Sequence, residues 1–325
     1  MEEFIVKVGR KIHEKFKPIS RKIPETDFYF DKPIATVEGG NQYIHDLLET
    51  GKPCMITRIG STELWCLKNA LEIEELKQDA SLIRIWKRIQ GKYNTWQHYT
   101  GYAMHRYSGF FPNTPQDLEK FSLLYFSELP KADILGVWYN YYEDIVCDKY
   151  CKHAQLIRLR SIEPYYSAQP WSKQLAGKKV LVIHPFEKTI QHQYAKQSLL
   201  FTNPDILPAF ELKTIKAVQS AAFNDSGFSS WFEALESMKK QMQQTDFDIA
   251  LIGAGAYGLP LAAYAKDLGK QAIHFGGSLQ ILFGIKGARW DDNPQINQFY
   301  NEHWVRPFPE DTPDGYKKVE DGCYW

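Results

Sequence analysis

The stretch FDIALIGAGAYGLPLAAYAKDLGKQAIHFGG, residues 247–277, contains two apolar runs separated by a glycine-rich turn and an alanine-rich segment. The first run, Phe247–Ile252, and the last, Gln271–Phe275, have the length and composition of buried strands. Between them, Leu259–Leu268 has the length of a helix and is followed by Gly269. Strand, helix and strand at this spacing are typical of a parallel α/β sheet.

The rest of the chain extends this pattern in both directions. Val180–Ile183 is an unbroken apolar run of the kind that parallel sheets bury on both faces. Further strands are expected at Cys54–Ile59, Ala132–Trp138 and Glu211–Ala217, and further helices at Gly40–Thr50, Glu63–Asn69, Ile190–Leu200 and Trp231–Thr245. Residues 70–130 are expected to be mostly helical, and residues 139–176 to be aromatic-rich and irregular. We therefore predict an α/β fold: a Rossmann-like parallel sheet flanked by helices, with a helical aromatic-rich insertion.

Three segments of the chain differ in composition. Residues 1–32 form a basic N-terminal segment, residues 33–176 an N-terminal α/β half with the helical region, and residues 177–325 a C-terminal Rossmann-like half with a tail. The first 22 residues suit a basic amphipathic helix that rests on an anionic membrane surface. The alternative reading is a helix packed on the body of the protein, or a frayed end.

Composition excludes several classes of protein. The 325 residues include 39 Lys and Arg against 39 Asp and Glu, and this zero net charge argues against a general nucleic-acid binder. A hydrophobic content of 44% excludes disorder of the whole chain. Five cysteines are too few and too scattered for a disulfide framework, which favours a cytoplasmic location. No apolar segment is long enough for a membrane span.

The glycine-rich turn is the first candidate site. Gly253, Gly255, Tyr257 and Gly258 belong to a G-x-G-x-x-G pattern between a strand and a helix, where backbone N–H groups can meet a diphosphate. An NAD site would also need an acidic residue at the end of the next strand, and none is present there. The alternative reading is a glycine turn that permits close packing of helix on strand.

Other candidates follow the remaining strands, at the edge where α/β sheets bind ligands. In the run Arg58-Ile59-Gly60-Ser61-Thr62-Glu63, Arg58 could pair with a phosphate, Gly60 could admit a ligand, and Glu63 could hold a divalent ion or act on a sugar hydroxyl. The same run could simply begin a helix, with an acidic residue that complements the helix dipole.

Two histidines also follow strands. His184 and His274, the latter before Gly276, could converge on one ligand. Lys188, Lys286 and Arg289 supply further cations for a diphosphate. Each of these residues could also be an ordinary structural or solvent-exposed one.

Taken in order, these pieces resemble the GT-D-type glycosyltransferases over roughly residues 40–290. The run Arg58–Glu63 is similar to the family's Arg-Phe-Gly-Asp-Gly-Glu run, and Asp248–Gly277 is similar to its last strand, glycine turn, helix and strand. The resemblance implies a GT-D-like fold and transfer of a sugar from a nucleotide-diphosphate donor, often UDP-linked, in bacterial surface-polysaccharide or capsule assembly. It also implies assistance by a divalent metal, Mn²⁺ or Mg²⁺.

This chain departs from the family pattern at the residues that are expected to bind the metal. The family's Asp-x-Glu motif carries over to Glu63, but Ser61 stands where the aspartate would be, and Ser is a poor ligand for these ions. His274 and Gly277 replace the terminal Asp and His of the last run. We therefore expect metal dependence that is weak or absent, with cations offsetting the diphosphate charge instead.

The sequence thus predicts a glycosyltransferase with Glu63 and His274 as candidate catalytic residues. The expected partners are a nucleotide-sugar donor and a glycan or lipid-linked acceptor, with aromatic residues between Trp138 and Trp171 as acceptor platforms. A lipid-linked acceptor would give the basic N-terminal segment a use at the membrane face. The alternatives are an NAD-dependent oxidoreductase that acts on a nucleotide-sugar, and a non-catalytic binding protein of glycan assembly.

Overall fold

The computed structural model describes residues 22–325 except 79–95, 97, 314 and 319. The predicted amphipathic helix at residues 1–21 lies outside the described residues. Among the described residues, no helix combines the length and apolar composition that crossing a membrane requires.

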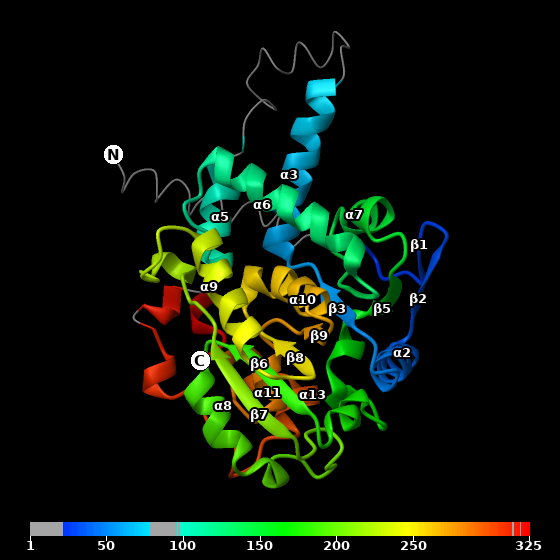
Figure 1. Ribbon diagram of the computed structural model, residues 1–325, viewed down its shortest axis with the longest axis vertical. Helices are drawn as coiled ribbons and strands as arrows, with labels where there is room; N and C mark the ends of the chain where they lie inside the picture. Colours follow the sequence, from blue (N-terminus) through cyan, green and yellow to red (C-terminus); the bar gives the residue numbers. More distant parts are fainter. Residues whose placement is uncertain (1–21, 79–95, 97, 314, 319) are drawn as a thin grey trace.

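A single nine-stranded sheet organises the molecule (Figure 1). Its order is β1-β2-β5-β4-β3-β9-β8-β6-β7, and every pairing is parallel except that of β1 with β2. The strands are β1 (Phe28–Tyr29), β2 (Lys32–Ala35), β3 (Cys54–Arg58), β4 (Ile134–Val137), β5 (Gln155–Arg158), β6 (Lys179–His184), β7 (Glu211–Lys216), β8 (Ile249–Ile252) and β9 (Gln271–His274). The predicted α/β fold with a parallel sheet is confirmed.

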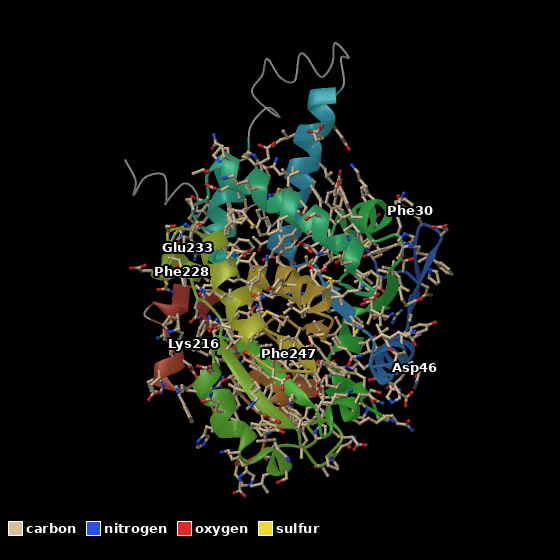
Figure 2. The ribbon with its side chains drawn as sticks, in the orientation of Figure 1. Phe30, Asp46, Lys216, Phe228, Glu233 and Phe247 are labelled. Atoms are coloured by element: carbon tan, nitrogen blue, oxygen red, sulfur yellow. The ribbon has the colours of Figure 1, made fainter. Side chains whose placement is uncertain are left out.

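Alternation along the central strands sends side chains to two cores. Leu181 and Ile183 of β6 join one hydrophobic cluster, and Val180 and Val182 join the other. Burial on both faces explains why β6 reads as an unbroken apolar run. The buried interior and the exposed hairpin contrast in Figure 2, where Phe247 lies inside the body and Phe30, 62% exposed, lies at its periphery.

Helices cover both faces of the sheet. The first core is closed by α3 (Ser61–Gln78), α5 (His98–Ser108), α6 (Pro115–Glu128), α7 (Glu143–Tyr150), α9 (Trp231–Gln244) and α10 (Gly258–Asp267). The second core is closed by α2 (Val37–Glu49), α8 (Glu187–Tyr194), α11 (Leu279–Leu282), α12 (Ala288–Asp291) and α13 (Pro294–Asn297). The helices α3, α5 and α6 lie between β3 and β4 in the chain and form the predicted helical insertion, with Phe110, Phe121 and Tyr125 in its core.

Two local expectations were wrong. The segment 139–176 is not irregular throughout, because it contains α7 and β5. Only the two middle residues of β5 are buried, so its sequence carries too short an apolar signal to be recognised. The helix expected at Ile190–Leu200 begins earlier, at Glu187, and ends at Tyr194, with a separate 3₁₀ turn at Gln197–Leu199.

The strands β3 and β9 are neighbours in the sheet although they lie far apart in the chain. The position between them is the switch point of the sheet, where the connections that follow the two strands run to opposite faces. The chain leaves β3 toward the first core, into α3, and leaves β9 toward the second core, into α11. Connections that diverge to opposite faces leave a crevice at the carboxyl ends of the two strands, where α/β proteins bind ligands.

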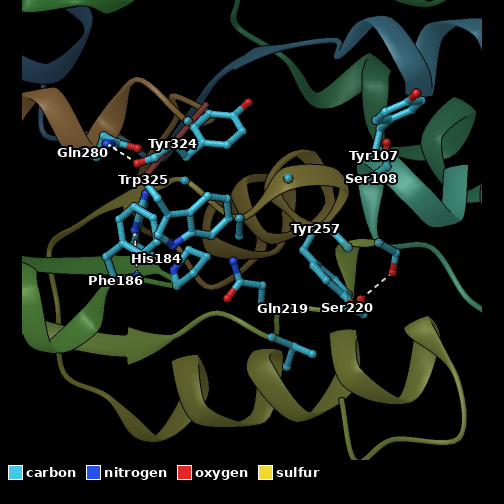
Figure 3. A pocket seen from close by; sticks show the side chains of 18 residues that line it. Tyr107, Ser108, His184, Phe186, Gln219, Ser220, Tyr257, Gln280, Tyr324 and Trp325 are labelled. Carbon is cyan, nitrogen blue, oxygen red and sulfur yellow. Dashed lines mark hydrogen bonds between the residues drawn. The ribbon is translucent and has the colours of Figure 1, made fainter. Parts of the chain in front are cut away.

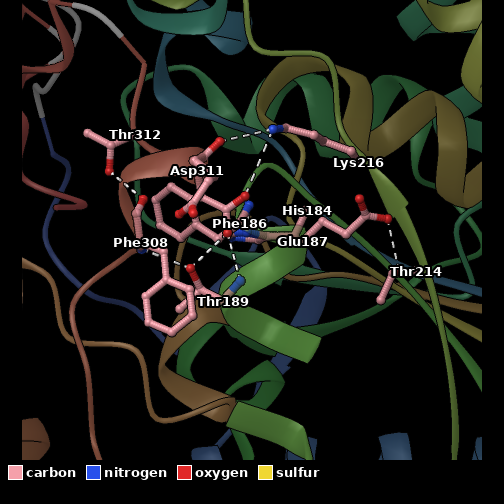
Figure 4. Close-up of polar contacts among 10 residues, drawn as sticks. His184, Phe186, Glu187, Thr189, Thr214, Lys216, Phe308, Asp311 and Thr312 are labelled. Carbon is pink, nitrogen blue, oxygen red and sulfur yellow. Dashed lines mark hydrogen bonds and ion pairs between the residues drawn. The ribbon is translucent and has the colours of Figure 1, made fainter. Parts of the chain in front are cut away.

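The segment near the C-terminus holds α8 in place beside this edge (Figure 4). Asp311, only 2% exposed, accepts hydrogen bonds at Oδ2 from the backbone N–H and the hydroxyl of Thr189, each at 2.7 Å. Thr189 Oγ1 also accepts from the N–H of Phe308 at 2.9 Å. This carboxylate therefore satisfies a donor in the first turn of α8, as a capping residue does.

Replacing Asp311 by alanine is expected to lower the free energy of unfolding by about 2 kcal/mol, because two buried donors lose their acceptor. Urea denaturation followed by circular dichroism measures the change. The neighbouring Glu310→Ala, at an exposed side chain, is the matched control and should leave the midpoint nearly unchanged. Equal midpoints for the two variants would contradict the capping role of Asp311.

Candidate functional site

The crevice at the switch point is a cleft that encloses about 1190 Å³, part of it open to solvent. We call it the switch-point cleft, and its walls come from the segments that follow β3, β4, β5 and β9. Its lining residues include Arg58, Gly60, Ser61, Glu63, Trp138, Arg160, Glu163, His274, Gly276, Arg289 and Tyr324. Three arginines and two glutamates therefore face one opening.

Arg58 is fixed at the junction of β3 and β9. Its guanidinium lies over the ring of Trp138, with Cζ 4.5 Å from the ring centroid. Gly276 has a φ of +76°, which favours glycine, and a Cβ there would lie 2.4 Å from Arg58 Nη1, so a side chain at this position would displace the guanidinium. Arg58 Nε is buried and has no hydrogen-bond partner among the described residues, which leaves it a donor for a bound anion.

Glu63 lies on the first turn of α3 and is 7% exposed. A Cβ on Gly60 would lie 1.8 Å from its Oε2, so the carboxylate occupies the space above that glycine. Gly60 lines the cleft, and its missing side chain makes room for Glu63, so its predicted contact with a ligand stays a prediction. Glu63 therefore belongs to the first turn of a helix and also lines the cleft, so the two readings of this run do not exclude each other.

Glu163 is a second carboxylate in the cleft, and sequence reasoning missed it. Burial raises its pKa above the usual value for glutamate, against the opposing effects of a hydrogen bond from Ser278 and of the charges of Arg58 and Arg160. Nothing in the residues around Glu163, Glu-Pro-Tyr-Tyr, signals a site, because the 3₁₀ turns that follow β5 place it there. Arg160 and Tyr324, which also line the cleft, were likewise not identified from the sequence.

A second hollow adjoins the cleft and encloses about 700 Å³, part of it open to solvent. Figure 3 shows its side chains. We call it the aromatic pocket, and its lining residues include Tyr107, His184, Phe186, Gln219, Gly253, Gly255, Tyr257, Tyr324 and Trp325. It shares Tyr107, Ser108, Gly255, Gly277 and Tyr324 with the switch-point cleft, so the two hollows are neighbours.

The two histidines lie in different hollows and do not meet on one ligand atom. His184 lines the aromatic pocket and His274 the switch-point cleft. Burial lowers the pKa of each imidazole to about 3, and the charge of Arg58 contributes at His274. Both rings are therefore neutral near pH 7, and His274 also makes a 3.2 Å contact between its Nδ1 and Thr57 Oγ1. Its catalytic role stays a prediction.

The glycine turn has a different use from the one its pattern suggested. A Cβ on Gly253 would lie 2.5 Å from His184 Cδ2, and a Cβ on Gly258 would lie 2.2 Å from His274 Nε2. The N–H of Gly253 donates to Ile183 O, and the N–H of Gly258 donates to Gly255 O, so neither remains for a phosphate. These two glycines permit close packing against imidazoles, while Gly255, with a φ of +53°, lines both hollows.

The remaining predicted residues are placed as follows. Ser61 lines the cleft and donates a 3.2 Å hydrogen bond to Asn140 Oδ1. Arg289 lines the cleft, and its Nη1 donates to Tyr324 Oη at 3.0 Å. Tyr257 lines the aromatic pocket, with its ring stacked on Trp231. Lys188 is exposed on α8, and Lys286 lies near the ring of Tyr300; neither lines a hollow.

The predicted acceptor platforms are brought to the site only in part. Trp138 lines the switch-point cleft. Trp171 is fully buried and packs in the second core, together with Tyr165. Part of this aromatic content therefore fills the core, as aromatic side chains commonly do.

The side chains of the cleft do not fit a bound divalent metal. Glu63 is the single carboxylate of the expected motif, and the hydroxyl of Ser61 is directed to Asn140. Within the described ranges, the one group of three metal-type ligands within reach of one another is His45, Asp46 and Glu49, which lies on α2 and not in the cleft. Three arginines in the cleft add positive charge that disfavours a cation there.

A family model of the GT-D fold-like domain, GT-D-like, matches residues 40–282, which is more than half of the chain. No curated protein and no solved structure gives a significant match. The family points to a glycosyltransferase-like function, and it agrees with the resemblance and with the fold. The chain belongs to the GT-D-like family.

Proposed function

We propose that the switch-point cleft binds a nucleotide-diphosphate sugar and that the protein transfers its sugar to a glycan or lipid-linked acceptor. The observation that carries the proposal is the meeting of Arg58, Arg160 and Arg289 with Glu63 and Glu163 at the carboxyl ends of β3, β5 and β9. Arginines suit a diphosphate because their planar donors match phosphate oxygens. Carboxylates suit the activation of an acceptor hydroxyl and the positioning of sugar hydroxyls.

In this mechanism the chain's own side chains perform the electrostatic work. The arginines would stabilise negative charge that builds on the leaving diphosphate, in a site partly shielded from water. Glu63 would accept the proton of the acceptor hydroxyl or hold the sugar in position. Because the donor set does not fit a divalent metal, we propose transfer whose metal dependence is weak or absent, and no step is routed through an ion.

The acceptor would enter at the aromatic wall of the cleft, which includes Trp138, Trp290 and Tyr324. The ring of Trp138 already contacts two cations, with Arg58 Cζ 4.5 Å and Lys22 Nζ 4.0 Å from its centroid. Aromatic rings stack on the apolar faces of sugars, which supports a glycan acceptor at this wall. A lipid-linked acceptor and a role in surface-polysaccharide assembly extend the same proposal. In that setting residues 1–21 would contact a membrane surface from the cytoplasmic side.

The oxidoreductase alternative gains no support from the structure. The strand β9 ends in His274, and Phe275 and Gly276 follow it. No Asp or Glu therefore stands at the end of this strand, where an NAD site carries the acidic residue that binds the ribose. The amides of Gly253 and Gly258 are also used within the protein.

A thermal-shift panel of nucleotide-sugars, with and without Mn²⁺, tests the donor proposal. A bound donor raises the unfolding midpoint by mass action. We expect at least one nucleotide-sugar to raise it, with little change on adding Mn²⁺, and NAD(H) to have no effect. A shift by NAD(H) alone would overturn the proposal, as would the absence of any shift by a nucleotide-sugar.

Replacing Arg160 by alanine is expected to weaken binding of the donor about tenfold, the effect of losing one charge-assisted contact at an exposed side chain. Isothermal titration calorimetry measures the dissociation constant. Arg306→Ala is the matched control, because Arg306 pairs with Asp291 on the surface and lines neither hollow. Equal affinities for wild type and Arg160→Ala would remove Arg160 from the donor site.

A further inference from the structure

The two neighbouring hollows differ in charge. The switch-point cleft is lined by five charged side chains, three arginines and two glutamates. The aromatic pocket is lined by no Lys, Arg, Asp or Glu among the described residues. Its one titratable imidazole, that of His184, is neutral near pH 7 because burial lowers its pKa to about 3. An uncharged compartment therefore opens onto a charged one.

The aromatic pocket offers flat apolar walls. Phe186 and Tyr257 are each 2% exposed and form its inner wall. Tyr107, Tyr324 and Trp325 are half-buried, so parts of their rings remain open to a ligand. Planar aromatic ligands such as nucleic-acid bases bind to such walls by stacking.

Two polar groups can recognise the edge of a planar ligand. The N–H of Phe186 donates to His184 Nδ1 at 3.0 Å, so the ring proton of the neutral imidazole lies on Nε2, which is then a donor. Figure 3 shows the carboxamide of Gln219 beside the His184 ring. Among the described residues this carboxamide makes no side-chain hydrogen bond, so it keeps both a donor and an acceptor for a ligand.

Two buried polar atoms of the pocket residues also lack partners in the described part of the chain. These are Gln280 Oε1 and Trp325 Nε1, an acceptor and a donor. Buried polar atoms are normally hydrogen-bonded, so these two atoms are available to a polar partner.

We propose that the aromatic pocket binds the base of the nucleotide donor, while the diphosphate and sugar lie in the switch-point cleft. The inference rests on the proposed function. It places one ligand across both hollows, with its uncharged part in the uncharged pocket and its charged part in the charged cleft. A nucleotide joins a neutral planar base to a charged diphosphate through one ribose, and the hollows share Gly255 and Gly277 at their junction. His184 Nε2 and the Gln219 carboxamide read the edge of the base.

An acceptor sugar is the competing occupant of the aromatic pocket, and the observations favour the base. A sugar presents hydroxyl groups around its whole ring and needs many polar partners. The pocket instead supplies rings on several sides and few free polar groups.

The test compares Gln219→Leu with Gln241→Leu, a control at an exposed glutamine on α9. Titration calorimetry gives dissociation constants for UDP, dTDP, GDP, ADP and inorganic pyrophosphate. We expect wild type to bind one nucleoside diphosphate at least tenfold more tightly than pyrophosphate. Gln219→Leu should weaken that nucleotide about five- to tenfold, the effect of one lost hydrogen-bonded pair, and leave pyrophosphate unchanged.

A second variant guards against a failure to fold. Gln219→Glu keeps the shape of the side chain, and its charge in the uncharged pocket should weaken the nucleotide at least as much. If a nucleotide binds but neither variant changes its affinity, the base site is wrong while the proposed function stands. The same holds if the variants raise only the KM of an acceptor, or weaken pyrophosphate equally. If no nucleotide binds to wild type, the proposed function itself fails.

Discussion

Replacing Glu63 by glutamine is expected to slow sugar transfer by about 100- to 1,000-fold, the usual effect of removing a positioned acid–base group. Glutamine keeps the shape of the side chain but cannot accept a proton at neutral pH. The shape matters here, because Glu63 Oε2 fills the space above Gly60 and the side chain is 7% exposed. Donor affinity should change much less than the rate, since the arginines of the cleft supply the cations.

The measurement is the steady-state rate with the nucleotide-sugar that the thermal-shift panel identifies. Glu72→Gln is the matched control, because Glu72 lies on the same helix, pairs with Lys68, and lines neither hollow. Circular dichroism should show an intact fold in both variants, with at most a small loss of stability from the helix dipole at Glu63. A rate for Glu63→Gln within a fewfold of wild type would exclude Glu63 as the reacting carboxylate. The chain would then have Glu163 as its remaining candidate.

The sequence predicts the sheet best where strands are buried on both faces. The strands β6, β8 and β9 are apolar throughout their middles, so they were placed within two residues of their observed ends. The outer strands β2 and β5 were not predicted. Each is four residues long and only partly buried, and β2 contains Pro33, which usually argues against a strand. Pairing with neighbouring strands holds such segments in the sheet, and their own composition does not show it.

The sequence predicted several individual residues of the candidate site, but it did not predict which of them lie together. Examining the residues after each strand found Arg58, Glu63 and His274, which line one cleft. It did not find Glu163, because that residue follows β5, which was itself unrecognised, through 3₁₀ turns. It also expected the two histidines to converge on one ligand, whereas the structure places His184 and His274 in different hollows. The order of the strands in the sheet decides which hollow a residue lines. The spacing of residues along the chain does not determine that order.

The glycine pattern illustrates the same limit. Gly253 and Gly258 stand at the positions that a diphosphate-binding loop requires, and nothing local distinguishes the two uses. The distinction comes from imidazoles that approach from other strands, His184 on β6 and His274 on β9. A prediction about Gly258 therefore tests the packing role directly.

Gly258→Ala is expected to lower the free energy of unfolding by about 3 kcal/mol, because it overpacks a buried site. In an open helix the same change would stabilise the protein by up to about 1 kcal/mol, since alanine is the better helix former. At Gly258 the backbone is already helical, with φ −59° and ψ −47°, so strain plays no part. The cost comes from a Cβ that would lie 2.2 Å from His274 Nε2 and 2.3 Å from its Cδ2.

His274 has little freedom to move aside, because it is 4% exposed and its Nδ1 contacts the fully buried Thr57. Gly269→Ala is the control: it has a φ of +78° and no neighbour within 4 Å, so it should cost only about 1 kcal/mol of backbone strain. Urea denaturation of Gly258→Ala, His274→Ala and the double variant completes the test. If His274 is the obstacle, the two changes will be strongly non-additive, and Gly258→Ala will cost little in the His274→Ala background. Additive costs would show instead that Gly258 is required for another reason, which would reopen the case for a phosphate at this turn.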